Sequence, residues 1–171
     1  HYLMKRGDFE PACVALTEAE RRARGPQASA EVAYSSAFLA RAVSDWALAL
    51  QSYRRAHEKF LELDDRTGQA DSQAGIGASL YHLNRPVEAI EPLEEAARGY
   101  REVRDREGEA IAQGALALVQ ADLGQPARAL ATSARALELI ARVPSPLHAA
   151  DLQIDRARLL LQARRPAEAW D

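Results

Sequence analysis

Small residues recur along this chain at a fixed interval of 40 residues, and this period constrains the fold more than any other feature. Four columns of the repeat hold alanine almost throughout: Ala30, Ala70, Ala110 and Ala150; Ala37, Gly77, Ala117 and Ala157; Ala49, Ala89, Ala129 and Ala169; and Ala56, Ala96 and Ala136. The same register contains Pro86, Pro126 and Pro166. A chain that repeats itself in this way is expected to fold as a stack of similar units, because each unit buries its apolar face only against its neighbours.

Within one unit, the apolar residues are spaced as on a helix. Between Ala70 and Leu83 they recur at steps of three and four residues, which places them on one helical face. A break follows at Asn84, and Pro86 then opens a second helix, since the amide hydrogen that proline lacks would be unpaired in the first turn. Because the other units repeat this layout, we expect an all-α chain of antiparallel helical hairpins that stack into a solenoid.

The period also predicts where the units begin and end. We expect a partial unit at 1–24, hairpins at 28–64, 66–104 and 106–143, and a truncated unit at 146–171. A short loop is expected around Gly25-Pro26, where the spacing between units falls from 40 to 37 residues. The sequence does not begin with methionine and stops as a second helix begins, so we expect a fragment of a longer protein.

Two of the small columns lie 12 residues apart, one on each arm of every hairpin, as in Gly77 and Ala89. Small residues that face each other allow antiparallel helices to approach closely. A large side chain at either position would overpack the hairpin and cost about 1–3 kcal/mol. These pairs are therefore predicted to set the geometry of each hairpin.

The small-residue pair, a further alanine seven residues later, and a Gly, Asn or Ser at the inter-helix turn together resemble the tetratricopeptide repeat. The usual unit of that family has about 34 residues. The longer unit of this chain has its extra residues near an Asp-Arg-x-Gly-x-Ala junction, and it resembles arrays in bacterial signalling proteins and transcriptional regulators. The resemblance implies an α-α superhelix that serves as a non-catalytic scaffold for a protein or peptide partner.

In that family the first helices of successive hairpins line a concave groove, so the resemblance nominates their inward-facing residues as partner contacts. The candidates are Glu31, Tyr34, Phe38, Arg41, Asp71, Tyr81, His82, Leu118, Asp122 and Arg158. Aromatic members of this set would anchor an extended or helical segment through a large contact area at low entropic cost. The alternative for Tyr34 and Phe38 is that they pack between hairpins. The acidic members disfavour the carboxylate clamp of chaperone-binding relatives, because an acidic tail would be repelled.

Charge and composition exclude several other classes of partner. A formal net charge of −3 and a pI near 5.9 give no general attraction to nucleic acid or to anionic membranes. Cys13 is the only cysteine, which excludes an internal disulfide and suits a cytoplasmic location. No apolar run approaches the roughly 18 residues of a membrane helix. Arginine far exceeds lysine, as is typical of GC-rich bacterial genomes.

No constellation in the sequence predicts catalysis, a metal site or a cofactor. The four histidines are dispersed, and no pair has the spacing and supporting acid of a helical metal site. Adjacent carboxylates such as Glu94 and Glu95 point about 100° apart on a helix and do not face each other. Two alternatives to a partner groove remain open: self-association through incomplete terminal units, and control of an attached catalytic or DNA-binding domain.

Overall fold

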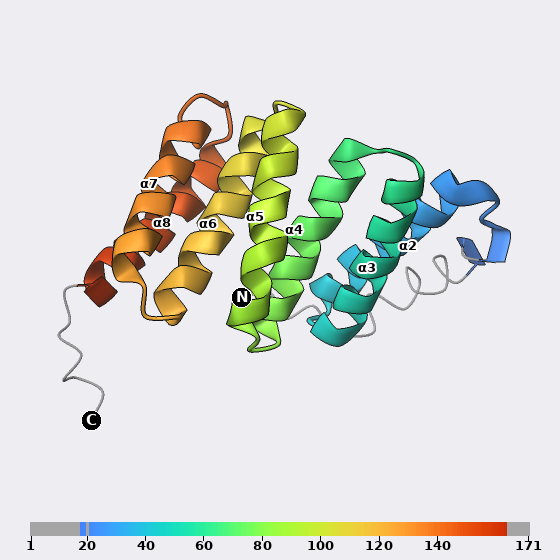
Figure 1. The fold of residues 1–171 in the computed structure, drawn as a ribbon, viewed down its shortest axis with the longest axis horizontal. Helices are drawn as coiled ribbons and strands as arrows, with labels where there is room; N and C mark the ends of the chain where they lie inside the picture. Colours follow the sequence, from blue (N-terminus) through green and yellow to red (C-terminus); the bar gives the residue numbers. More distant parts are fainter. Residues whose placement is uncertain (1–17, 20, 164–171) are drawn as a thin grey trace.

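The structure, a computed structural model, describes residues 18–19 and 21–163, and the regular elements in this part of the chain are helices. They are α2 (Gly25–Ala42), α3 (Trp46–Glu62), α4 (Arg66–His82), α5 (Pro86–Glu102), α6 (Arg106–Asp122), α7 (Pro126–Ile140) and α8 (Pro146–Ala163). Figure 1 shows them side by side in chain order along the longest axis of the molecule. Each helix packs against the next, so the expected all-α array of antiparallel hairpins is confirmed.

A three-residue turn of one type joins the helices from α2 to α7, and it recurs every 20 residues. Its central residue has a positive φ in every case, at Ser44, Asp64, Asn84, Arg104 and Gly124. The amide of the following residue donates to a carbonyl five residues earlier, as from Asp45 to Ala40 at 2.8 Å, which is a Schellman-type helix end. The 40-residue period of the sequence therefore contains two similar units of helix plus turn.

Helix starts alternate between two solutions. Asp45, Asp65 and Asp105 cap α3, α4 and α6, and their carboxylates accept hydrogen bonds of 2.9–3.1 Å from the amides three residues later. Pro86 and Pro126 begin α5 and α7, as the sequence predicted. The expected loop around Gly25-Pro26 was wrong, because these residues form the first turn of α2, where proline is also favoured.

The small columns form the buried seam of each complete hairpin. Alanines of these columns from Ala30 to Ala136 are at most 2% exposed. A Cβ added at Gly77 would lie 2.5 Å from Leu93 Cγ, which shows how closely α4 and α5 approach. Ala150 and Ala157 on α8 are exposed instead. In the earlier units these columns face the second helix of the hairpin, whereas Pro166 and Ala169 lie outside the described residues.

The junction glycines seat an aromatic ring from the preceding helix. A Cβ at Gly68 would lie 2.3 Å from Phe60 Cδ1, and one at Gly108 would lie 2.4 Å from Tyr100 Cδ1. One period later the glycine is replaced by His148 and the ring by Ile140. Steric fit therefore explains the glycine of the Asp-Arg-x-Gly junction.

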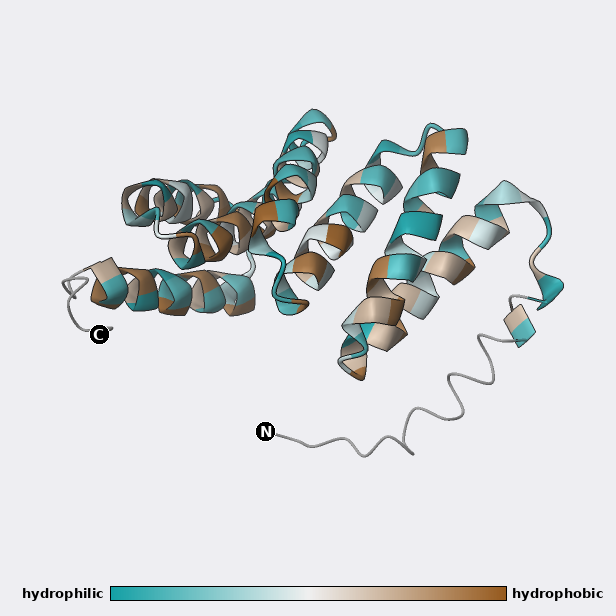
Figure 2. Cartoon of the chain, turned by 60° about the horizontal axis from the view of Figure 1, so that its bottom comes forward, coloured by the Kyte–Doolittle hydropathy of each residue, from teal (hydrophilic) through white to brown (hydrophobic). Residues whose placement is uncertain are grey.

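The first helices of the hairpins lie on the inner side of the stack. Each of α2, α4, α6 and α8 contacts the next first helix directly, whereas α3, α5 and α7 lack comparable contacts with one another. In Figure 2 hydrophobic and hydrophilic residues alternate along each helix. None of the helices described is both long enough and apolar enough to cross a membrane.

Candidate functional site

All ten residues nominated from the sequence fall on first helices: four on α2, three on α4, two on α6 and one on α8. Four of them, Tyr81, His82, Asp122 and Arg158, line one open cavity of about 1060 Å³. The cavity lies where the carboxyl-terminal ends of α4, α6 and α8 meet. The structure thus brings the C-terminal candidates together, while their role as partner contacts stays a prediction.

Tyr81 is held in place across two successive units. Its hydroxyl donates a 2.6 Å hydrogen bond to Asp122 Oδ2, which joins the end of α4 to the end of α6. Burial raises the pKa of Tyr81 to about 12, with further increases from the hydrogen bond and the charge of Asp122. The phenol therefore stays neutral at physiological pH and presents a fixed aromatic edge to the cavity.

His82 forms the second aromatic wall. Its ring stacks on Trp46, with centroids 3.9 Å apart and planes 12° apart, and it meets the ring of Tyr81 edge-on. Burial and the nearby positive charge of Arg41 lower the pKa of His82, so the imidazole is neutral at pH 7. The expectation that Trp46 is a packing residue is confirmed by this stack.

The N-terminal candidates do not join this cavity, and two of them serve packing. Tyr34 lies edge-on to Tyr53 and Phe60, at centroid distances of 5.7 and 6.3 Å. Burial, reinforced by the charge of Asp71, raises the pKa of Tyr34 to about 12. Asp71 accepts a 2.7 Å hydrogen bond from the hydroxyl of Tyr100, and burial raises its pKa. Of the two interpretations of Tyr34, contact between helices is the one found.

The remaining candidates differ in exposure. Phe38 is 53% exposed, and the guanidinium carbon of Arg41 lies 4.9 Å above the centre of its ring. Glu31 is exposed and accepts a hydrogen bond from Gln27 at 2.9 Å. Leu118 is half-buried against a cluster that includes Leu159. Phe38 and Arg41 are therefore a separate exposed pair on α2.

The cavity offers recognition chemistry. Within the described ranges, no group of three or more histidine, cysteine or acidic side chains is placed to hold a metal ion. Cys13 and Trp170 lie outside those ranges. The lining instead combines aromatic rings, the apolar Leu159 and Leu161, one carboxylate and one guanidinium. Such a mixture suits a peptide that carries both an apolar and a charged side chain.

Sequence reasoning missed several residues of this cavity. Asn84 and Gly124 line it from the turns that follow α4 and α6, and Leu161 lines it from α8. The turn register at 84 and 124 was visible in the sequence and marks the ends of helices that lie side by side. The projection of Leu161 depends on the tilt of α8, which no sequence pattern reports.

A family model described as tetratricopeptide repeat matches residues 28–102. No curated protein matches the sequence. Among solved structures, the crystal structure of BtubC (BKLC) from P. vanneervenii is similar over 92% of this chain and 67% of its own, with a TM-score of 0.77 and 18% sequence identity. At that identity the likeness shows a shared fold. Residues 28–102 are thus tetratricopeptide repeats, as their alanine columns suggested, and the same helical-hairpin fold continues through α8.

Proposed function

We propose that this chain is a non-catalytic scaffold that binds a protein or peptide partner in the cavity between α4, α6 and α8. Tetratricopeptide repeats generally mediate protein–protein interactions, and the cavity is the feature that favours one place for it. The single observation that carries the proposal is the aromatic wall of Tyr81 and His82. Both rings are fixed, one by Asp122 and the other by Trp46.

Fixed rings favour binding because little side-chain entropy is lost when a partner arrives. Arg158 lines the same cavity, its side chain is largely exposed, and its only carboxylate contact among described residues is Asp155 at 3.2 Å on its own helix. Leu161 adds an apolar surface that is 66% exposed. We infer a partner segment with an aromatic or aliphatic side chain for the rings and Leu161, flanked by an acidic residue for Arg158.

Self-association is a second candidate, and α8 provides a specific observation in its favour. Leu147, Ile154 and Leu161 are 51–69% exposed and lie seven residues apart, so they form one apolar stripe along the helix. Figure 2 shows these hydrophobic residues interspersed with hydrophilic ones along α8. Sedimentation velocity at several concentrations tests this candidate: a concentration-dependent dimer that Ile154→Asp abolishes supports it, and a strict monomer rejects it.

The wider context is also a proposal. We infer a bacterial cytoplasmic protein in which this array receives a signal for an attached regulatory domain, since arginine dominates over lysine and the sequence contains one cysteine. Mass spectrometry of proteins captured with the complete natural chain tests this. Capture of only extracellular proteins would contradict the inference.

The cavity assignment is tested by selecting binders from a displayed peptide library and measuring their affinity for three variants. We expect Tyr81→Ala and Arg158→Ala each to weaken binding by about tenfold or more, as for central contact residues. Phe38→Ala is the matched control, because it removes an exposed aromatic side chain outside the cavity. If Phe38→Ala weakens binding while Tyr81→Ala leaves it unchanged, the partner does not occupy this cavity.

A further inference from the structure

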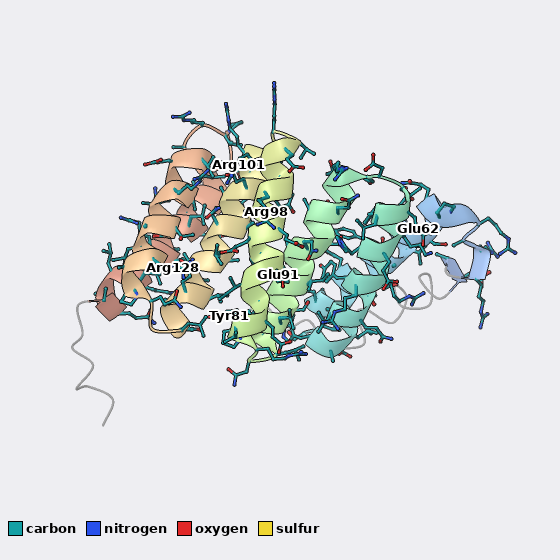
Figure 3. All side chains as sticks on the ribbon, viewed as in Figure 1. Glu62, Tyr81, Glu91, Arg98, Arg101 and Arg128 are labelled. Atoms are coloured by element: carbon teal, nitrogen blue, oxygen red, sulfur yellow. The ribbon has the colours of Figure 1, made fainter. Side chains whose placement is uncertain are left out.

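A second groove lies on the face formed by the second helices, between α5 and α7, with α6 as its floor. Its volume is about 420 Å³, and its lining includes Arg98 and Arg101 from α5, Gln113 and Gln120 from α6, and Arg128 and Thr132 from α7. Figure 3 labels Arg98 and Arg101 on α5 and Arg128 on α7. This groove is separate from the cavity between α4, α6 and α8, with which it shares no lining residue.

Gln120 brings an unpartnered donor to the floor of this groove. The residue is only 4% exposed, and its Oε1 accepts a 2.8 Å hydrogen bond from the hydroxyl of Thr132. Its amide nitrogen has no hydrogen-bond partner among the described residues. A buried donor without a partner is unfavourable, so an acceptor supplied by a ligand would be stabilised here.

Two of the three arginines have no carboxylate within hydrogen-bonding distance. Arg128 donates to the side chain of Gln125 at 2.8 Å, and Arg98 lies 3.6 Å from Glu95 in an exposed contact. Arg101 is different, because its Nη2 lies 2.7 Å from Oε1 of the buried Glu109. That pair fixes Arg101 at the edge of the groove and leaves Arg98 and Arg128 able to bind an anion.

The 40-residue period provides an internal reference for this arrangement. The equivalent positions in the preceding groove hold Glu58 for Arg98, Leu61 for Arg101, Leu80 for Gln120 and Glu88 for Arg128. In that groove Gln73 donates a 2.6 Å hydrogen bond to Glu95, whereas its equivalent Gln113 has no partner among the described residues. Packing of the repeat therefore does not require arginine or a buried amide at these positions.

We propose that the groove between α5 and α7 binds an acidic segment of a protein partner, whose carboxylates pair with Arg98 and Arg128 and accept a hydrogen bond from Gln120. Guanidinium groups bind carboxylates through charge-assisted hydrogen bonds. The charges come from two helices on either side of an apolar floor that includes Leu116 and Ala97. An elongated groove of this kind matches a peptide with spaced carboxylates better than a single small anion.

Fluorescence anisotropy with a labelled peptide of alternating glutamate and alanine tests the proposal. The unaltered chain is expected to bind it at least tenfold more tightly than the same peptide with glutamine, and binding should weaken as salt rises. Arg98→Glu combined with Arg128→Glu is expected to abolish this preference. Arg54→Glu combined with Arg55→Glu changes the net charge equally on the exposed surface of α3 and is expected to retain it.

Gln120→Leu reproduces the residue of the preceding groove and is expected to reduce affinity for the acidic peptide several-fold. Thermal melting of each variant, followed by circular dichroism, verifies that the array remains folded. Equal binding of the glutamate and glutamine peptides would overturn the proposal, as would equal losses in the two double arginine variants. Displacement of the peptide by inorganic phosphate at matched charge concentration would overturn the assignment to an acidic segment.

Discussion

The two grooves on the second-helix face have the same architecture and opposite charge. Arg98, Arg101 and Arg128 with Glu94 give the groove between α5 and α7 a formal charge of +2. The equivalents of its charged and exposed lining positions between α3 and α5 include Glu58, Glu88, Glu91 and Arg54, with a formal charge of −2. The alanine columns beneath both grooves remain buried. The repeat therefore conserves its packing from unit to unit while its outer surface changes, and the surface is where one unit acquires a chemistry of its own.

The largest effect is expected where the two units are the same. Gly108→Ala places a Cβ against the ring of Tyr100, and Gly68→Ala places one against Phe60. Each substitution is expected to lower the free energy of unfolding by about 2–3 kcal/mol, measured by urea denaturation. Adding Tyr100→Ile to Gly108→Ala should recover part of the loss, since Ile140 and His148 already coexist one period later. Unequal costs at the two glycines would break the equivalence of the two units.

A smaller effect is expected from Glu109→Gln, which gives α6 the residue that α4 has at Gln69. Oε1 of Glu109 receives Arg101 and Arg135 at 2.7 and 3.2 Å, and its side chain is 5% exposed. Loss of these charge-assisted bonds is expected to cost about 1–2 kcal/mol, because both arginines can regain water. The same urea titrations measure this cost. An unchanged stability would show that the buried pair contributes nothing beyond what glutamine supplies.

The comparison is sharpened by transferring the charge pattern. Glu58→Arg with Glu88→Arg converts two positions of the groove between α3 and α5 to the residues of its neighbour. We expect a few-fold tighter binding of the acidic peptide, because the buried Leu80 supplies no donor. Anisotropy measures the gain, and Glu18→Arg with Glu31→Arg is the control for net charge. A gain of the same size in the control would attribute the effect to overall charge.

The smallest effect concerns Asp71, which lies where α6 has Ile111. Burial raises the pKa of Asp71 above its ordinary 3.8. The native state therefore holds its proton more tightly than the unfolded state, and stability falls as pH rises from below 3.8 through the raised value. Asp71→Asn removes this fall and should gain less than about 1 kcal/mol at pH 7 relative to pH 3, since the group is half-exposed. Melting temperatures of both proteins at these two values measure the difference, and an identical pH dependence would contradict it.

Much of the packing was predictable because it is periodic. The buried alanine columns, the turn at Asn84 and the start of α5 at Pro86 follow from spacing alone. Tyr34 was ambiguous because its ring contacts Tyr53 and Phe60, which lie on another helix. Gly25-Pro26 was misassigned because the same dipeptide suits a loop and a helix start. The unpartnered amide of Gln120 depends on Thr132, 12 residues away across the hairpin, and periodicity does not report such pairs.

The central claim is that the carboxyl-terminal ends of α4, α6 and α8 form the principal partner site. Hydrogen–deuterium exchange of the chain with and without a selected peptide tests it directly. The account predicts slower exchange at residues 81–84, 121–125 and 158–162 and unchanged exchange along α3 and in the N-terminal half of α2. Protection confined to α5 and α7, or found only in α2 around Phe38, would contradict it.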